Sequence, residues 1–555
     1  MSDYTVADLV AEFLDRIGVS TSFGIISVHN IPMMDAIRKR NRIRMIPTRG
    51  EAGGAHMADG YARVTGNLGV LITSTGPGAA NAVGGLIEGR FASTPMLHIT
   101  GQSRTPHLGR GMGTTHDVDD QLGMLQASGK AAYRVPSAQE ALGTLMRAAT
   151  DALSAPCGPV SVEIPIDIQR TAIVRPAALD HLSLPVPTLP GPGNAALDQL
   201  ADMVHAARRP MLWVGNGAGD AGPEIEALLD LGFAMVCSWN GRGAVSEDHP
   251  MNLGGLNGGG VPMIEEFYGN CDLMIVCGSR LRGHETIDFS IKLPTPLVQI
   301  DVDPSADGRT YPNDLFVLGD VKTTLKALTD RLVGWSPDPE FASDFSNLKT
   351  SARKAFAATL GPYASFADQL RTALPRETVF ARDVTINHST WGNRLFPLHD
   401  ARANVYPVGA GIGQGLSLSI GAAIGAAETS PDRKTLCMTG DGGFMLNLGE
   451  LWTAIQERPN LTILVMNDAG YGVIRHIQDA TGAGRSFETL DLPDLSELAR
   501  IAGIPFRRVS SPDTFGSTVA EAIRETGPNL VEVDMTTIGA HPPYFPYGTK
   551  AVAVD

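Results

Sequence analysis

The sequence predicts an α/β protein with three domains, each built on a doubly wound parallel sheet. A chain of 555 residues is too long for one domain, since domains usually span roughly 100–200 residues. Patterns typical of strands and of helices alternate along the chain, which indicates βαβ units. Proline-rich segments interrupt this alternation and are typical of linkers. We therefore expect domains at 1–172, 190–334 and 360–540, a linker at 176–192, another domain boundary at 335–339, and a C-terminal tail at 541–555.

The individual elements follow from apolar periodicity. In the first domain we expect a helix over 6–17, a strand over 43–47, a helix from 51 to about 64, and a strand over 69–74. In the other two domains, short apolar runs predict the strands. These runs lie at 211–214, 234–237, 273–276 and 297–300 in the middle domain, and at 379–384, 435–438, 461–466 and 530–533 in the third domain.

Composition and charge exclude several classes of protein. Lys and Arg (44) are outnumbered by Asp and Glu (59), and the net charge of −15 would repel a nucleic acid backbone. The N-terminus lacks the basic and then apolar order of a signal peptide. The longest apolar run, near 416–427, is too short and too rich in Gly and Ser to cross a bilayer. Five cysteines without a C-x-x-C pair fit a reducing compartment, so we expect a cytoplasmic protein.

The strongest chemical signal is the run Gly440-Asp441-Gly442-Gly443. It follows an expected strand and opens an expected helix that runs toward Ala454. Glycines at the start of a helix leave its unpaired N–H groups open to an anion, because no side chain blocks them. On its own this run is also typical of a structural turn between a strand and a helix.

A second acid supports a ligand site. Asp468 follows the next expected strand, and the carboxyl ends of neighbouring parallel strands meet where ligands bind. We therefore expect Asp441 and Asp468 to lie close together. Two side-chain oxygens, one carbonyl and two phosphate oxygens would suit an octahedral Mg²⁺ completed by water. The sequence thus predicts a diphosphate–magnesium site.

Gly440-Asp441-Gly442, followed after twenty-four residues by Asn467-Asp468, resembles the thiamine diphosphate signature. Nearly the whole chain resembles the branch of acetolactate synthase and benzaldehyde lyase. The resemblance implies a pyrimidine-binding, a middle and a diphosphate-binding domain, in that order. It also implies that Asp441, Asp468 and the carbonyl of Gly470 hold the metal, with Gly440, Gly442 and Gly443 at the diphosphate. The family most often has Asn where this chain has Asp468, which adds negative charge at the metal.

The first domain supplies a matching half. Residues 49–63 resemble the family segment whose glutamate touches the aminopyrimidine ring of the cofactor, and residues 75–81 resemble the turn that follows. By this resemblance Glu51 protonates N1′, which favours the imino form at the 4′ position and removal of the C2 proton. A structural role is the alternative, because acids are common at helix starts.

Residues 408–416 resemble the family segment that bends the cofactor. The side chain of Ile412 would lie between the two rings, and the carbonyl of Ala410 would accept a hydrogen bond from the 4′ nitrogen, so the segment contributes orientation. Asn387, His388 and Ser389 are further candidates for contacts with the diphosphate.

The substrate side carries two histidines and a glutamine. His29 matches the position of an active-site histidine in benzaldehyde lyase, within a loop that replaces the common Pro-Gly-Gly turn. The segment 115–121 can be aligned in two ways: His116 matches the glutamine of acetolactate synthases, or Gln121 matches the glutamine of benzaldehyde lyase. Both residue types can relay a proton or hold a carboxylate. The alternative is a solvated acidic turn.

The middle domain contains a glycine-rich loop at 214–219. Its third glycine falls one position early, and no acid ends the next strand, so NAD is not expected. Acetolactate synthases carry a structural FAD here, and residues 301–304 resemble their adenosine-side segment. Residues 278–283 depart from their Gly-Ala-Arg-Phe-Asp-Asp pattern, so FAD is considered but not favoured.

The resemblance implies thiamine diphosphate- and Mg²⁺-dependent decarboxylation of a pyruvate-like 2-oxo acid, with carboligation to a second carbonyl. The alternatives are benzaldehyde lyase-like cleavage or formation of 2-hydroxy ketones, and simple decarboxylation. An inactive, cofactor-binding paralogue is a separate class. The family further implies a homodimer or homotetramer with sites between subunits, Glu51 coming from one chain and Asp441 from its neighbour. The tail at 541–555 is rich in aromatic residues and prolines and would form a lid or a subunit contact.

Overall fold

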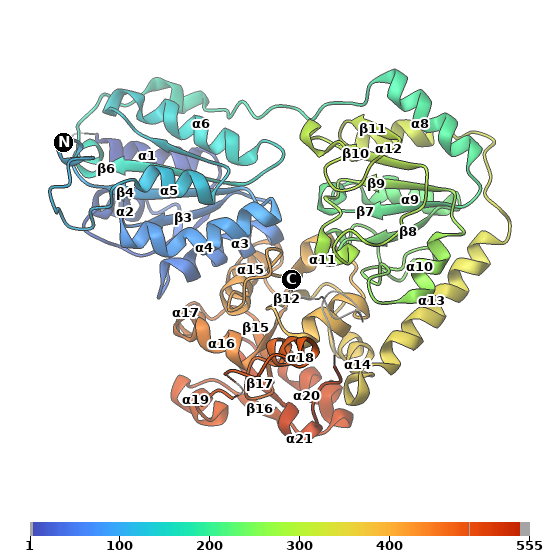
Figure 1. Cartoon of the computed structure of the whole chain (residues 1–555). Coiled ribbons are helices and arrows are strands. Elements are labelled where there is room, and N and C mark those ends of the chain that lie inside the picture. The colour runs from blue at the N-terminus through green and yellow to red at the C-terminus, as the bar shows by residue number, and fades with distance from the viewer. Residues whose placement is uncertain (1–3, 488, 544–555) are drawn as a thin grey trace.

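A computed structural model describes residues 4–487 and 489–543. Within these residues the chain forms three parallel sheets, of six, five and six strands, each with helices on both faces (Figure 1). This confirms the predicted fold class. The third domain lies below the first and the middle domains in Figure 1, and it contacts both.

The first sheet has the strand order β2-β1-β3-β4-β6-β5. One apolar core lies between this sheet and helices α1, α2 and α6, while α3, α4 and α5 pack on the opposite face. The strands are β1 (Thr21–Gly24), β2 (Arg44–Pro47), β3 (Gly69–Thr73), β4 (Met96–Gln102), β5 (Ala131–Arg134) and β6 (Pro159–Pro165). The helices are α1 (Val6–Arg16), α2 (Ile31–Arg40), α3 (Glu51–Thr65), α4 (Pro77–Ala92), α5 (Gln121–Ser128), α6 (Ala141–Leu153) and the short α7 (Ile166–Gln169).

The middle sheet has the order β11-β10-β9-β7-β8. Its expected strands form within a residue of their predicted ends, because each is a continuous apolar run buried on both faces of a parallel sheet. The strands are β7 (Pro210–Val214), β8 (Ala234–Cys237), β9 (Leu273–Cys277), β10 (Leu297–Asp301) and β11 (Leu315–Leu318). The helices are α8 (Asn194–Ala206), α9 (Gly222–Asp230), α10 (Pro262–Tyr268), α11 (Gly283–Thr286) and α12 (Val321–Thr329), and α13 (Phe341–Ala358) leads to the third domain.

The third sheet has the order β13-β12-β14-β15-β17-β16, so its strands follow one another as in the first sheet. The strands are β12 (Val379–Arg382), β13 (Asn404–Val405), β14 (Thr435–Gly440), β15 (Leu461–Asn467), β16 (Phe506–Val509) and β17 (Asn529–Asp534). The helices are α14 (Phe366–Ala373), α15 (Gly415–Thr429), α16 (Asp441–Leu446), α17 (Leu451–Glu457), α18 (Gly472–Thr481), α19 (Leu495–Ala502), α20 (Phe515–Ala522) and α21 (Met535–Ile538).

The helix expected from Gly440 toward Ala454 is interrupted. Helix α16 ends at Leu446, a 3₁₀ turn follows at Leu448–Glu450, and α17 begins at Leu451. The break lies at Asn447, which has non-helical dihedrals (φ −124°, ψ 28°). Its side-chain amide donates a hydrogen bond to the carbonyl of Gly413. A short polar side chain that bonds to backbone elsewhere competes with continued helix, which explains the error in the prediction.

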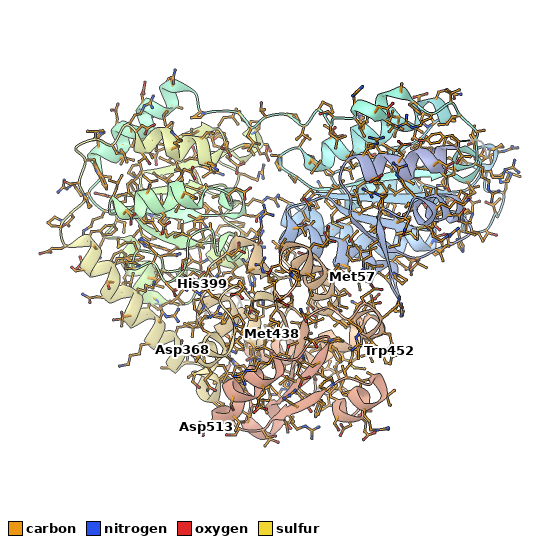
Figure 2. All side chains as sticks on the ribbon, turned by 180° about the vertical axis from the view of Figure 1, so that it is seen from behind. Met57, Asp368, His399, Met438, Trp452 and Asp513 are labelled. Carbon is orange, nitrogen blue, oxygen red and sulfur yellow. The ribbon has the colours of Figure 1, made fainter. Side chains whose placement is uncertain are left out.

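The first and third domains meet where α3 crosses α15. A Cβ atom at Gly60 would lie 2.1 Å from the carbonyl oxygen of Leu418, and one at Gly421 would lie 1.9 Å from that of Met57. Figure 2 shows Met57 at this junction. Only glycine permits such close approach of two helix backbones. The glycines therefore hold the two domains at a short, defined separation.

Buried histidines make the stability of the fold depend on pH. His98 on β4 is fully buried, with Nε2 2.8 Å from the Thr73 hydroxyl and Nδ1 3.0 Å from the Ser161 hydroxyl. Burial lowers its pKa from 6.5 to about 3. The unfolded chain therefore binds more protons than the folded chain below pH 6.5, and stability falls as the pH is lowered.

We expect a His98→Gln variant to lose part of this pH dependence. The free energy of unfolding, measured with urea between pH 6 and 4, should fall less steeply than in the wild type, by about 1.4 kcal/mol per pH unit. The exposed His181 provides the control, because His181→Gln should keep the wild-type slope. Equal slopes for all three proteins would contradict the assignment.

Candidate functional site

The carboxyl ends of the strands carry the predicted site residues. In the first and third sheets the chain order reverses between the first and third strands, β1 beside β3 and β12 beside β14. Ligands of doubly wound sheets bind at such switch points. Glu51 follows β2, Asp441 follows β14, and Asp468 follows β15. Both halves of the predicted site therefore lie at ligand-binding edges.

Asp441 and Asp468 come together as predicted. Strands β14 and β15 are neighbours, with Gly440 paired to Met466 in the register. The Asp441 carboxylate is buried and accepts a hydrogen bond of 2.8 Å from the N–H of Gly470. That bond holds the turn after β15 against the start of α16, so Asp441, Asp468 and Gly470 occupy one small volume.

The two carboxylates form an electrostatically unfavourable pair. Burial, and then the charge of Asp468, raises the pKa of Asp441 to about 7. Burial likewise raises the pKa of Asp468. Two buried acids side by side oppose each other's ionisation, and a bound cation would remove that penalty. A cation bound beside them would favour their ionised forms.

Arg475 supplies positive charge to this pair. One of its guanidinium nitrogens lies 2.6 Å from Oδ2 of Asp468 and 3.0 Å from the carbonyl oxygen of the same residue. A residue one turn into α18 thus offsets the charge that Asp468 adds relative to Asn. Sequence reasoning missed Arg475. A basic residue in the first turn of the helix that follows the Asp468 loop could have been predicted to pair with that acid.

The donor set fits a magnesium ion. Two carboxylates and a backbone carbonyl are hard oxygen ligands, and phosphate oxygens and water would complete six-fold coordination. The described residues hold no cluster of three or more His, Cys, Asp or Glu side chains placed for a metal. The predicted site does not need such a cluster, because it draws its remaining ligands from the backbone and from the diphosphate.

The loop that carries Ala410 and Ile412 is exposed at its tip. Ala410 has a left-handed backbone (φ +62°), which costs a non-glycine residue roughly 1 kcal/mol or more, and the side chain of Ile412 is 44% exposed. The stem of the loop is clamped instead. The Glu88 carboxylate of α4 accepts the N–H groups of Val408 (2.5 Å) and Gly409 (2.9 Å). The exposed tip at Ala410 and Ile412 is therefore connected to a stem, Val408 and Gly409, that hydrogen bonds hold in place.

Asp383, a buried aspartate at the switch point of the third sheet, connects this loop to the end of β14, where the diphosphate is predicted to bind. Asp383, directly after β12, accepts the N–H of Gly413 at 3.1 Å from both carboxylate oxygens and the hydroxyl of Thr439 at 3.2 Å. Burial raises its pKa to about 6. A Cβ atom at Gly443 would lie 2.6 Å from this carboxylate. Sequence reasoning missed Asp383, and an acid at the end of the first strand of the domain was the signal.

Glu51 is the first residue of α3. It is partly exposed, and its Oε2 accepts a hydrogen bond of 3.1 Å from the side-chain amide of Asn81. Asn81 belongs to α4, which begins just after the turn at Gly76. Gly76 needs its positive φ (+58°), and a Cβ atom there would lie 2.2 Å from the carbonyl oxygen of His116. The Glu51 carboxylate and the segment 114–117 thus flank the same turn.

The structure brings His29 and His116 together. Their ring centroids lie 5.3 Å apart, and Nδ1 of His116 lies 3.3 Å from the Ser74 hydroxyl. His29 is buried, and its Nδ1 has no partner among the described residues. Burial, followed by the charge of His116, lowers the pKa of His29, so its ring stays neutral near pH 7. An unpaired ring nitrogen at this edge can meet a ligand.

Gln121 points into the protein. It is 1% exposed, and its side-chain oxygen accepts the Thr75 hydroxyl (2.8 Å) and the Gly76 N–H (2.6 Å). Its amide nitrogen donates to Glu163 on β6 (3.0 Å). Gln121 therefore stabilises the turn at Gly76 by hydrogen bonds from the protein interior, whereas His116 lies beside His29. Sequence alone had left the two alignments open.

Asn387 and His388 already contact protein groups, Asn387 within its own helical segment and His388 on other elements. The Trp391 indole N–H donates to the side-chain oxygen of Asn387 (2.8 Å), and the His388 ring packs against Trp239 of the middle domain and Tyr406. The side chain beside Gly440 is that of Thr385, whose Cγ2 lies 3.3 Å from where a Cβ at Gly440 would be. Thr385 is therefore a further candidate for a contact with the diphosphate at the Gly440 turn.

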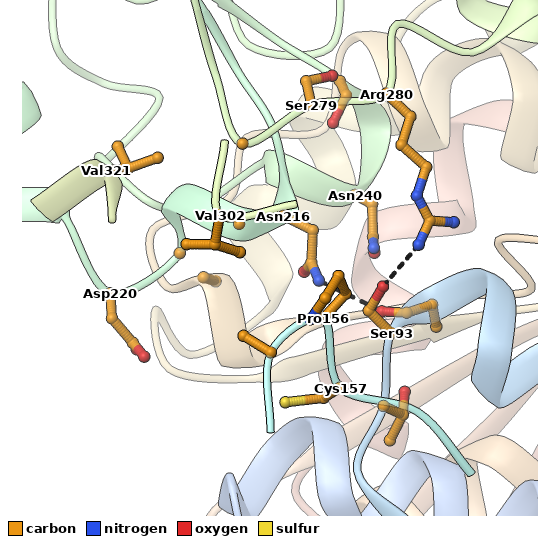
Figure 3. A pocket seen from close by; sticks show the side chains of 18 of the residues that line it. Ser93, Pro156, Cys157, Asn216, Asp220, Asn240, Ser279, Arg280, Val302 and Val321 are labelled. Carbon is orange, nitrogen blue, oxygen red and sulfur yellow. Dashed lines mark hydrogen bonds between the residues drawn. The ribbon is translucent and has the colours of Figure 1, made fainter. Parts of the chain in front are cut away.

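A cavity of about 660 Å³ lies among the three domains. Figure 3 shows Arg280 of the middle domain reaching to Ser93 of the first domain, a hydrogen bond of 3.0 Å. The N–H groups of Gly215, Gly217 and Gly219 already donate to backbone carbonyls. These glycines therefore offer no free cradle for a dinucleotide phosphate. The volume suits an organic ligand.

The C-terminal tail is described as far as Pro543. His541 is buried and stacks on Tyr363, with ring centroids 5.2 Å apart and planes inclined by 14°. The predicted lid or subunit contact mostly concerns residues 544–555, which lie outside the described residues. Across the described part of the chain, every helix is too short or too polar to cross a membrane.

Models of thiamine pyrophosphate enzymes match the chain in three places. The N-terminal TPP binding domain matches residues 4–124, the central domain residues 197–328, and the C-terminal TPP binding domain residues 386–533. The matches lie on the three parallel-sheet domains in the predicted order. The chain therefore belongs to the thiamine pyrophosphate enzyme family, and it is a thiamine diphosphate-dependent enzyme that forms or cleaves carbon–carbon bonds.

Relatives extend over almost the full length. A probable 2-ketoarginine decarboxylase of Pseudomonas aeruginosa is 31% identical over 95% of this chain and 94% of its own. The acetolactate synthase isozyme 2 large subunit of Escherichia coli is 29% identical over 98% of both chains. Acetolactate synthase 2 of tobacco chloroplasts is 26% identical over 95% of this chain and 81% of its own. The chain is similar both to a probable decarboxylase and to acetolactate synthases.

Proposed function

We propose that this enzyme uses Mg²⁺ and thiamine diphosphate to decarboxylate a pyruvate-like 2-oxo acid and to join the remaining fragment to a second carbonyl, as in acetolactate synthases. The observation that carries the magnesium assignment is the convergence of Asp441 and Asp468 at the edge of the third sheet. Similarity over 98% of an acetolactate synthase subunit supports carboligation as the leading form.

The residues around the cofactor have distinct tasks. Bound thiamine diphosphate supplies the electron sink for the bond beside the substrate carbonyl. Asp441, Asp468 and the Gly470 carbonyl hold the metal, with Gly440, Gly442 and Gly443 at the diphosphate. The Ala410 carbonyl would accept a hydrogen bond from the 4′ amino group, and the Ile412 side chain would contact the rings and orient them. Glu51 holds and returns the proton at N1′.

We further propose that two chains build each site. In the single chain, Ile412 is 44% exposed, and Ile87 and Phe91 on α4 are 42% and 49% exposed. Apolar side chains gathered at a functional edge indicate a surface that another subunit covers. Glu51 from one chain would then serve the cofactor held by Asp441 of its neighbour.

All five cysteines lie in the described part and are unpaired, which supports a cytoplasmic location.

A simple decarboxylase is the second candidate. The 31% identical relative is a probable decarboxylase, and the paired rings of His29 and His116 place two proton carriers side by side. A proton delivered there would end the reaction before carboligation. A third candidate is a lyase acting on 2-hydroxy ketones, because His29 matches the position of the active-site histidine in benzaldehyde lyase.

An NMR time course with thiamine diphosphate, Mg²⁺ and pyruvate distinguishes these candidates. We expect acetolactate to accumulate as carbon dioxide is released. Acetaldehyde alone would favour the simple decarboxylase, and unchanged pyruvate with bound cofactor would contradict pyruvate as donor.

His29→Ala should slow pyruvate consumption at least about tenfold without changing cofactor affinity, because it removes a substrate contact.

A further inference from the structure

Glu450 joins the third domain to the start of the helix that carries Glu51. It ends the 3₁₀ turn after α16 and is 2% exposed. Its Oε1 accepts the N–H of Gly50 at 2.9 Å and that of Arg49 at 3.1 Å, and its Oε2 lies 3.2 Å from the same Arg49 nitrogen. The Thr453 hydroxyl fixes the carboxylate from its own domain at 2.7 Å. These contacts converge on the two residues before Glu51.

This arrangement reproduces half of a capping box, with the acid supplied from another domain. In a capping box, a Glu at the third helical position accepts the N–H of the N-cap residue. The N-cap of α3 is Gly50, which has no side chain to cap with, and the third position is Gly53. A Cβ atom at Gly53 would lie 2.1 Å from Oε1 of Glu450. The Glu450 carboxylate therefore fills the space that a side chain at Gly53 would need.

The neighbouring residues are held in the same way. The Arg49 guanidinium donates to the carbonyl of Pro47 (3.0 Å) and to the side-chain oxygen of Gln456 on α17 (2.9 Å). The backbone that leads into Glu51 is thus held by the third domain as well as by the first. The α16–Glu450 segment also begins with Asp441, so in the proposed dimer one short stretch connects the metal ligand of one site to the helix that carries the acid of the other.

We propose that Glu450 is a positioning residue that sets the orientation of Glu51 by capping α3 across the domain boundary. This inference rests on the proposed function. A displacement of a catalytic group by about 1 Å can lower a rate roughly a hundredfold. Loss of the cap should therefore affect the chemistry at N1′ more than it affects cofactor binding.

Glu428 provides a matched control. Like Glu450, it lies in the third domain and accepts hydrogen bonds from the first, from the hydroxyls of Ser20 (2.9 Å), Thr21 (2.6 Å) and Tyr61 (2.7 Å). It lies near the end of α15 and contacts neither the Glu51 helix start nor the predicted metal ligands in the described structure. Glu428→Gln thus weakens the same domain interface without touching the cap.

The test compares full-length Glu450→Ala, Glu450→Gln, Gly53→Ala and Glu428→Gln with the wild type. Gly53→Ala keeps the carboxylate but pushes it away from the N–H groups. Without cofactor, Glu450→Ala and Gly53→Ala should speed hydrogen exchange at the amides of Arg49 and Gly50 about tenfold. With thiamine diphosphate and Mg²⁺, both should slow C2 proton exchange at least about tenfold, while cofactor affinity changes less than about threefold.

The outcomes separate the two proposals. Glu450→Gln keeps one acceptor oxygen, so it should lie between the wild type and Glu450→Ala, and it decides the question if Glu450→Ala does not fold. Equal amide and C2 exchange in the Glu450, Gly53 and Glu428 variants would overturn the positioning role alone. A wild type that binds the cofactor without any C2 exchange would overturn the proposed function, and this inference with it.

Discussion

Replacing Glu51 with Gln is expected to slow C2 proton exchange on bound thiamine diphosphate at least about a hundredfold. The side chain keeps its size and its contact with Asn81, which lies 3.1 Å away in the wild type, but it can no longer transfer a proton to N1′. General acid–base groups typically contribute factors of about 10² to 10⁴, which makes this one of the largest effects predicted for the protein. The exchange is followed by acid quench and NMR of the cofactor.

Binding measurements separate chemistry from folding. The Gln variant should bind thiamine diphosphate and Mg²⁺ as the wild type does, because the proposed diphosphate and metal contacts lie in the third domain. Asn81→Ala, which removes the partner of Glu51 but leaves its carboxylate, should have a smaller effect. A Glu51→Gln protein that exchanges within about threefold of the wild-type rate would contradict the acid–base assignment.

The Asp441→Ala variant is expected to lose Mg²⁺-dependent binding of thiamine diphosphate, by about a hundredfold or more in affinity. It removes one of the two carboxylates at the predicted metal and the acceptor of the Gly470 N–H, so the turn after β15 loses its anchor. Asp468→Asn is the matched control. It keeps an oxygen ligand and restores the residue most common in the family, so it should retain most of the affinity. Titration with thiamine diphosphate at fixed Mg²⁺, followed by tryptophan fluorescence, measures both.

Mixing the two inactive variants tests whether subunits share the site. If Glu51 and Asp441 come from different chains, a mixed dimer of Glu51→Gln and Asp441→Ala has one intact site and one with both changes. Random co-assembly should then restore about a quarter of the wild-type activity, since half of the dimers are mixed and each has one working site. A co-expressed mixture as inactive as the separate variants would show that each chain builds its own site.

The comparison of sequence and structure is clearest at the third domain. The strands β14 and β15, the acids after them and their proximity were all predicted, because apolar runs specify buried parallel strands and the carboxyl ends of neighbouring strands must meet. The helix from Gly440 was predicted as continuous and is broken at Asn447. The break depends on the Gly413 carbonyl, which is distant in sequence, so local periodicity could not reveal it.

The same distinction applies to the residues around the site. Glu51, Asp441, Asp468, Ala410 and Ile412 were named from local motifs alone, and their roles stay predictions. Asp383 and Arg475 act through partners on other segments, and neither belongs to a recognised motif. The arrangement of His116 beside His29, with Gln121 turned inward, depends on how the loops after β1, β3 and β4 pack, which a linear alignment does not contain.

By itself the sequence determined the α/β class, because periodicity is a local property of the chain. The resemblance of its motifs to the thiamine diphosphate family indicated the cofactor and the residues expected to bind it. The tertiary structure decided how those residues are held. Glu450 reaches Gly50 across a domain boundary, Glu88 clamps the loop before Ala410, and α3 meets α15 through glycines. Each of these contacts joins segments about 320 or more residues apart, and only the packing of the first domain against the third brings them within hydrogen-bonding or van der Waals distance.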